Sequence, residues 1–363
     1  MPLKSEKILN LPQGTEVIHL EEALQHRTLT RTLNDLYTSW GYLPVKTPVF
    51  DFYDNYRQLL TGKGKDNIYR LMDRDGDLLM LRSDITLFLA RQMGLLLGET
   101  ELPTRVCYSD IILRHQHRED ISKNEFFQTG VELIGSDGLE GDMEILLLLN
   151  KTMSKLELPY YLHLGSRNLF NLIIEEKNRS IKLIEALSER DIESLRSEFS
   201  VLFTPEKSAF LCTFFQFIGN ATEMKTLLTR GKDFLPVEAL KEAEYLIKLS
   251  EELNSTGIKG ELRLDLSEIG SQPYHTGIVF QAYMDGLDSA VAFGGRYNDL
   301  LAHFGFDAPS VGFSILLRKV EALLKKSSFE ELELKPVKAE GCSWKERFEN
   351  AEKLRKEGRI VTL

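Results

Sequence analysis

Cysteine is scarce in this sequence. Its 363 residues include only three cysteines, Cys107, Cys212 and Cys342, which lie far apart. Their spacing matches no metal site, and an odd, sparse set is typical of proteins in a reducing compartment. We therefore predict a cytoplasmic protein without a metal centre.

Long apolar runs are also missing. No stretch of 18 or more apolar residues occurs, so we expect no transmembrane helix. The first residues, MPLKSEKILNLPQG, lack the apolar centre of a secretory signal. We therefore expect no contact with a membrane.

Positive charge is in deficit. The chain has 45 lysines and arginines against 55 acids, which gives a formal net charge of -10. Proteins that bind nucleic-acid phosphates usually carry basic patches, so this balance argues against a tRNA-binding role. A hydrophobic content of 42% over this length is ample for a sizeable core and for two or three domains.

What the sequence does have is a distinctive stretch from Val106 to Gly135. Residues 106–113 are apolar and β-prone, residues 115–125 are polar, and residues 126–134 are apolar again, which predicts two strands joined by a polar turn. Gln128 and Glu132 are an even number of residues apart and therefore share one face of a strand. An unpaired buried carboxylate is costly, so this face meets either water or a ligand.

Periodicity predicts further elements around this hairpin. Asp84 and Thr86 stand at a predicted helix start, where such residues usually act as caps but can also hold a ligand. The remaining segments follow apolar spacing. Helices are expected at 21–40, 142–155 and 343–356, a hairpin at 67–80, strands at 160–164 and 260–266, and a helical region at 167–255.

The hairpin resembles motif 2 of class II aminoacyl-tRNA synthetases, and specifically of the histidyl-tRNA synthetases. The matching residues are Arg114-His115, Phe126-Phe127-Gln128 and Gly130-Val131-Glu132. Residues 81–86 resemble the family segment in which an acid and a threonine hold the amino group of histidine. Two histidine-specific signatures are also kept, through Tyr274, Thr276 and Gly277, and through Gly295, Arg296 and Tyr297, while His275 stands where the family has a second tyrosine.

The departures from that family fall on its ATP site. Gln116 replaces a glutamate, Ser122 replaces a loop arginine, Gly270 replaces an arginine, and Lys319 stands at the arginine of motif 3. Lysine cannot reproduce the planar, forked donation of a guanidinium. Cationic side chains that contact the negative charge developing on a phosphate typically raise the reaction rate by orders of magnitude. The four changes together predict loss of adenylate formation.

The resemblance implies an α+β fold, with a class II synthetase-like antiparallel sheet flanked by helices. Residues 1–166 and 256–325 would form the core, residues 167–255 an inserted helical domain, and residues 326–363 a linker with a vestigial tail like the anticodon-binding domain. The helix at 21–40 and the strand after it would build the family's homodimer interface.

A kept histidine pocket with a broken ATP site resembles the family of ATP phosphoribosyltransferase regulatory subunits. The resemblance implies a non-catalytic partner of a short catalytic subunit, needed for its activity and for feedback inhibition by L-histidine, with no cofactor. The histidine-binding candidates are Asp84, Thr86, Arg114, Gln128, Glu132, Tyr274 and His275, with Arg296 and Tyr297 as further pocket candidates. Two alternatives stay open, namely a divergent histidine-activating enzyme and a ligand-free scaffold.

Overall fold

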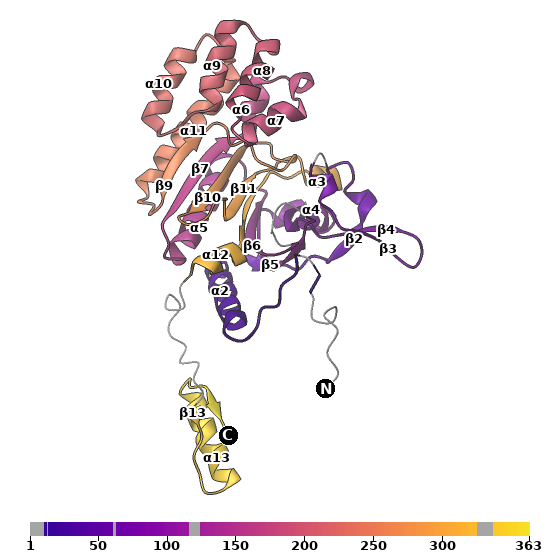
Figure 1. The fold of residues 1–363 in the computed structure, drawn as a ribbon, viewed down its shortest axis with the longest axis vertical. Helices are drawn as coiled ribbons and strands as arrows, with labels where there is room; N and C mark the ends of the chain where they lie inside the picture. The colour runs from indigo at the N-terminus through magenta and orange to yellow at the C-terminus, as the bar shows by residue number, and fades with distance from the viewer. Residues whose placement is uncertain (1–10, 13, 61–62, 116–123, 325–336) are drawn as a thin grey trace, which may run out of the picture.

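The largest feature of the protein is a nine-stranded sheet (Figure 1). The computed structural model describes residues 11–12, 14–60, 63–115, 124–324 and 337–363. The strand order is β1-β5-β6-β12-β11-β10-β7-β9-β8, and every neighbouring pair is antiparallel except β1 with β5 and β7 with β9. This is the predicted antiparallel sheet.

Short strands β2, β4 and β3 form a second, antiparallel sheet, which includes the predicted hairpin. The strands are β1 (Leu43–Pro44), β2 (Phe50–Phe52), β3 (Arg70–Met72), β4 (Leu78–Leu81), β5 (Thr104–Leu113), β6 (Glu125–Ile134), β7 (Tyr160–Ser166), β8 (Ile218–Gly219), β9 (Glu261–Asp265), β10 (Ile278–Met284), β11 (Ala292–Arg296), β12 (Ser310–Leu316), β13 (Val337–Lys338) and β14 (Val361–Thr362).

Most α-helices follow the predicted pattern, with boundaries that differ by a few residues. The α-helices are α2 (Leu20–Ser39), α3 (Lys63–Asp66), α4 (Ile85–Leu96), α5 (Gly138–Lys155), α6 (Arg167–Ile173), α7 (Ile181–Ser188), α8 (Ile192–Leu202), α9 (Pro205–Phe215), α10 (Ala221–Gly231), α11 (Val237–Ser255), α12 (Leu317–Leu323) and α13 (Trp344–Lys356). Of these, α3 and α12 were not predicted. Among the described residues, none of these helices has the length and apolar character that a membrane span needs.

Strand alternation gives the large sheet two different faces. On β6, Val131 and Leu133 are fully buried in the main core, where they pack with residues of α2 and α5. Gln128 and Glu132 point to the other face, because side chains alternate along a strand. β12 repeats the pattern, with Phe313 in the core and the even-numbered residues opposite. Helices α2 and α5 therefore cover one face, whereas the polar residues gather on the other, beside α4.

The region between β7 and β9 is almost wholly helical, as predicted. Helices α6 to α10 lie together at one end of the molecule, and α11 contacts β7 and β9 (Figure 1). The division of the chain at residues 167 and 255 stays a prediction. Near the C-terminus, β13 and β14 form a parallel pair with α13 around Ala339, Ala351 and Val361.

Candidate functional site

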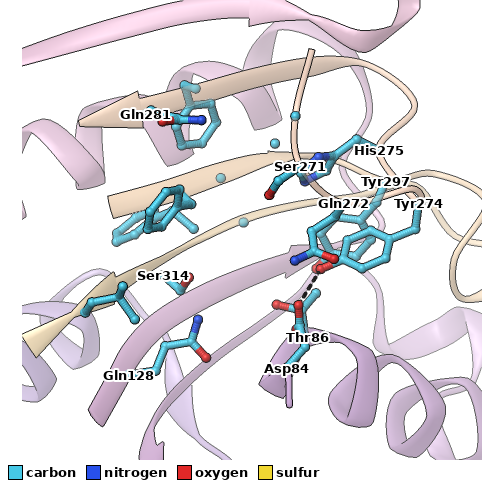
Figure 2. Close-up of a pocket in the computed structure, with 18 of the residues that line it drawn as sticks. Asp84, Thr86, Gln128, Ser271, Gln272, Tyr274, His275, Gln281, Tyr297 and Ser314 are labelled. Atoms are coloured by element: carbon cyan, nitrogen blue, oxygen red, sulfur yellow. Dashed lines mark hydrogen bonds between the residues drawn. The ribbon is translucent and has the colours of Figure 1, made fainter. Parts of the chain in front are cut away.

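The polar face of the large sheet borders a cavity of about 560 Å³. Figure 2 shows side chains from the sheet, from the start of α4 and from the loop before β10 around this space. The structure brings most of the predicted site residues together. Those lining the cavity are Asp84, Thr86, Arg114, Gln128, Glu132, Tyr274, His275 and Tyr297.

Glu132 is the centre of one end of the cavity. Its side chain is buried, with 1% exposure. Thr86 Oγ1 donates to Glu132 Oε1 at 2.5 Å, Tyr108 donates to the same oxygen at 3.3 Å, and the Tyr297 hydroxyl donates to Oε2. These three hydroxyls hold the carboxyl group in one orientation, as binding a small polar ligand requires.

Burial governs the protonation of this group. It raises the pKa of Glu132 to about 8, although its hydroxyl partners act in the opposite direction. The pKa of the Tyr108 and Tyr297 hydroxyls is also raised well above the ordinary value, chiefly by burial. Because the described residues place no cation in an ion pair with Glu132, a ligand that carries a positive charge or strong donors would supply the missing partner.

Asp84 lies beside this cluster, at the start of α4. Its Oδ1 accepts from the Leu87 backbone N–H at 3.2 Å and so caps the helix. Its Oδ2 accepts from the Tyr274 hydroxyl at 3.0 Å, the contact drawn in Figure 2. Arg114 Nη2 is 3.9 Å from the same Oδ2, and its Nε donates to the Ser83 carbonyl at 2.7 Å. Asp84 therefore both caps α4 and lines the cavity.

A glycine makes room for the Glu132 carboxyl. Gly312 on β12 pairs directly with Glu132 on β6 and with Gly295 on β11. A Cβ atom on Gly312 would stand 1.7 Å from Glu132 Oε2 and 2.4 Å from the Val131 carbonyl oxygen. Glycine is therefore required there if Glu132 is to lie flat against the sheet.

His275 and Gly270 form another tightly fitted pair. Gly270 has a φ of +76°, and a Cβ atom on it would stand 2.3 Å from His275 Nδ1 and 2.9 Å from Val279 Cγ1. Burial lowers the pKa of His275 to about 3, so its imidazole is neutral at pH 7. A residue with a side chain at position 270, including the arginine of the synthetases, does not fit this backbone.

Arg296 differs from the prediction. Its side chain does not line the cavity but points to the helix-covered face, where Nε and Nη2 donate to Asp142 Oδ1 at 2.8 and 2.6 Å. Successive residues of β11 face opposite sides of the sheet, so Arg296 and Tyr297 cannot both reach the cavity. In the signature GGRY, Gly294, Gly295 and Tyr297 therefore line the cavity, whereas Arg296 forms a buried ion pair on the other face.

The predicted ATP-site departures are only partly described. Gln116 and Ser122 lie outside the described residues. Lys319 lines the cavity, where its Nζ donates to Ser289 Oγ at 2.7 Å and to the Ala290 carbonyl at 3.4 Å. Its amine is thus anchored to the turn between β10 and β11.

Tyr108, Glu268 and Gln281 are among the cavity or near-cavity residues that sequence reasoning missed. Tyr108 contacts Glu132 and could have been found from strand alternation, because it lies two residues from Val106, which pairs with Glu132. Glu268 and Gln281 line the far end of the cavity. Both lie within or beside the first histidine-specific signature, but neither matches a family position named above, and no spacing rule singles them out.

Comparison with known proteins places this geometry in a family. A family model described as histidyl-tRNA synthetase matches residues 14–320. A curated ATP phosphoribosyltransferase regulatory subunit of Moorella thermoacetica is 30% identical over 317 residues, covering 86% of this chain and 81% of that protein. Its counterpart in Caldanaerobacter subterraneus is 28% identical over 366 residues, covering 98% of this chain and 94% of that protein.

Solved structures agree on the fold. A structure from Bacillus halodurans, titled as an ATP phosphoribosyltransferase regulatory subunit/histidyl-tRNA synthetase, superposes with a TM-score of 0.85 at 23% identity and covers 98% of this chain and 92% of its own. Histidyl-tRNA synthetase from Nostoc sp. gives a TM-score of 0.76 at 21% identity, covering 97% of this chain and 85% of its own. The chain has the histidyl-tRNA synthetase fold and belongs to the family of ATP phosphoribosyltransferase regulatory subunits.

Proposed function

We propose that this chain is the regulatory subunit of an ATP phosphoribosyltransferase and that its cavity binds L-histidine as a feedback inhibitor. The relatives are named regulatory subunits, so the role in the transferase is regulatory rather than catalytic. The partner would be a short catalytic subunit, and α2 with the strand after it would form a homodimer interface. The strongest support for a histidine site is the buried Glu132 carboxyl, which three hydroxyl groups hold in place beside the cavity.

Histidine has the groups that this end of the cavity lacks. Its ring and its ammonium group bring donors, whereas Glu132, Asp84 and Gln128 present acceptors. Gln128 Oε1 is buried and has no partner among the described residues. Asp84, Thr86, Gln128 and Glu132 would take the amino group and the imidazole, Tyr274 and His275 would close the ring side, and Arg114 would be left to meet a carboxylate. A buried acceptor without a donor is costly, which favours a bound ligand over a ligand-free scaffold.

The two described ATP-site positions speak against a histidine-activating enzyme. Gly270 has no space for an arginine, and Lys319 is anchored to Ser289 and Ala290. Adenylate formation requires cations on the developing phosphate charge. Histidine-dependent exchange of pyrophosphate into ATP would be the sign of that alternative activity.

The direct test is the rate of phosphoribosyl-ATP formation by the short catalytic subunit of the same organism. We expect activity to rise when this chain is added and to fall again with histidine. Inhibition requires that histidine bind one state of the assembly better than another. A rate that does not respond to this chain would contradict the regulatory role, and a rate that responds to the chain but not to histidine would contradict the feedback role.

Gly312→Ala tests the fit between the sheet and Glu132. The new methyl group would collide with the Glu132 carboxyl and with the Val131 carbonyl. We expect a loss of about 1–3 kcal/mol in the free energy of unfolding, as for other overpacked sites, and a clear loss of histidine affinity. Chemical denaturation and calorimetric titration measure the two effects.

Gly98→Ala is the matched control. A Cβ atom at Gly98 would meet only Glu101 Oε2, at an ordinary 3.6 Å, and lies outside the cavity wall. This variant should bind histidine like the unmodified chain. If both glycine variants bound histidine with equal affinity, Glu132 would not be part of the histidine-binding site.

A further inference from the structure

The end of the cavity away from Glu132 contains a second acid, Glu268. It lies in the loop after β9, where its Oε1 accepts from the Gly270 N–H at 3.1 Å. The Gln281 side chain also donates to it. Tyr283 donates to Gln281 Oε1 at 2.8 Å, which fixes the amide with its NH2 group free for Glu268. Hydrogen bonds from the Gly270 N–H and the Gln281 amide thus fix the orientation of the Glu268 carboxyl.

Glu268 forms no ion pair in the described part of the chain. Two guanidinium groups lie nearby but are bonded to other groups: Arg190, whose charge partly opposes the burial that raises the pKa of Glu268, donates to Asp265, and Arg167 Nη1 donates to the Ile269 carbonyl at 3.5 Å. His275 is close to the same loop, but burial keeps its imidazole neutral. Burial also raises the pKa of Glu268 to about 7, so near neutral pH it can take up or release a proton.

The surrounding groups select the charge of a ligand. The cavity as a whole is lined by four acids, Asp84, Glu132, Glu268 and Asp288, and by two basic residues, Arg114 and Lys319. The amine of Lys319 is bonded to Ser289 and Ala290. Because acids outnumber basic residues in the wall, an anion such as a triphosphate is disfavoured and a cation is favoured.

Unpartnered polar atoms also call for a ligand. Four buried side-chain atoms lack a partner within the described ranges, and two of them, Gln128 Oε1 and His275 Nδ1, belong to residues that line this cavity. Gln128 is itself only 6% exposed. Its Oε1 accepts and so needs a ligand that brings a donor, whereas His275 Nδ1 donates or accepts according to the tautomer of the ring. The cavity volume of about 560 Å³ lies well within the range of sites for ligands larger than one amino acid.

We propose that the Glu268 end of the cavity is a second, cation-binding subsite, which takes a protonated amine or an imidazolium with Glu268 as its counter-ion. This inference goes beyond the proposed function, because it concerns the end of the cavity opposite Glu132. The cation belongs either to a second histidine molecule or to the amine of a different ligand bound beside the first. Both sources share the same chemistry at Glu268.

The test is a calorimetric titration of the full chain with L-histidine at pH 8, where Glu268 is ionised, followed by a titration of the histidine-saturated chain with methylammonium. Two histidines per chain would identify a second histidine as the source. One histidine, followed by methylammonium binding, would identify a separate amine. In either case Glu268→Gln should weaken the second event at least tenfold, and Glu268→Asp should weaken it less.

Glu261→Gln is the control, since Glu261 is an exposed acid on β9 whose partner is Arg263. It should leave both binding events unchanged. A chain that binds one histidine and no methylammonium, or a Glu268→Gln variant that binds the second cation normally, would overturn the proposal. If the chain binds methylammonium through Glu268 but binds no histidine, the second subsite stands and the proposed histidine function fails. Thermal unfolding of each variant verifies that it is folded.

Discussion

Glu132→Gln is expected to lower the affinity for histidine roughly 10- to 100-fold while making the unliganded chain more stable at neutral pH. The variant keeps the shape of the side chain but cannot ionise to pair with the positive charge of a bound ligand. Hydrogen bonds to a charged group contribute about 1.5–3 kcal/mol, which converts to this range of affinity. Thr86, Tyr108 and Tyr297 would still surround the amide, so the cavity should keep its form.

The stability effect follows from the raised pKa. Burial lifts the pKa of Glu132 from an ordinary 4.5 to about 8 in the folded chain. Between these values the folded state holds a proton that the unfolded state has released, so the free energy of unfolding falls as pH rises from about 4.5 to 8. The loss is about 1.4 kcal/mol per pH unit for one such group. Glutamine has no proton to release and should remove this slope.

Denaturant unfolding of both proteins at pH 5, 6.5 and 8 measures the difference in slope. Glu261→Gln, at an exposed position, provides the control for the loss of one negative charge. Equal slopes in the Glu132→Gln variant and the unmodified chain would show that Glu132 is not the buried acid described here. Unchanged histidine affinity would contradict its place in the binding site.

Arg296→Met is expected to lower the free energy of unfolding by about 3–5 kcal/mol, because it leaves the Asp142 carboxylate buried without its cation. The two side chains are 6% and 2% exposed. Tyr245 also donates to Asp142 Oδ2 at 2.6 Å, but a hydroxyl carries no compensating charge. Burial already raises the pKa of Asp142 despite the neighbouring guanidinium. Urea unfolding measures the loss.

Two further variants separate the ion pair from simple loss of packing. Arg296→Met combined with Asp142→Asn should recover part of the stability, because the uncompensated charge is gone. Arg355→Met removes a surface pair with Glu352, whose side chains are 39% and 45% exposed, and should change stability by less than about 1 kcal/mol. If the double variant were no more stable than Arg296→Met alone, the charge would not be the cause.

The strand period made the cavity end at Glu132 predictable. Gln128 and Glu132 were expected on one face because their spacing is even, and the structure buries both there. The helix start at Asp84 was predictable for a similar reason, since an acid before an apolar helix acts as a cap. Local patterns therefore give the elements and the faces of their side chains.

Contacts between distant segments were not predictable in this way. The family signature that contains Arg296 and Tyr297 predicts both in the pocket, and only the pairing of Arg296 with Asp142, 154 positions away, reveals its place. Glu268 has no local signature, because its role depends on Gln281 across the sheet and on a cavity that several strands enclose. The lack of space at Gly270 likewise depends on where the His275 ring lies.

The backbone at Gly270 also limits what protein engineering could install in this cavity. With φ at +76° and the His275 ring against its Cα, this position cannot accept an arginine by a single substitution, because the loop and the ring would both have to move. A design that places an arginine here would therefore have to rebuild the loop and replace His275 with a smaller residue in the same step.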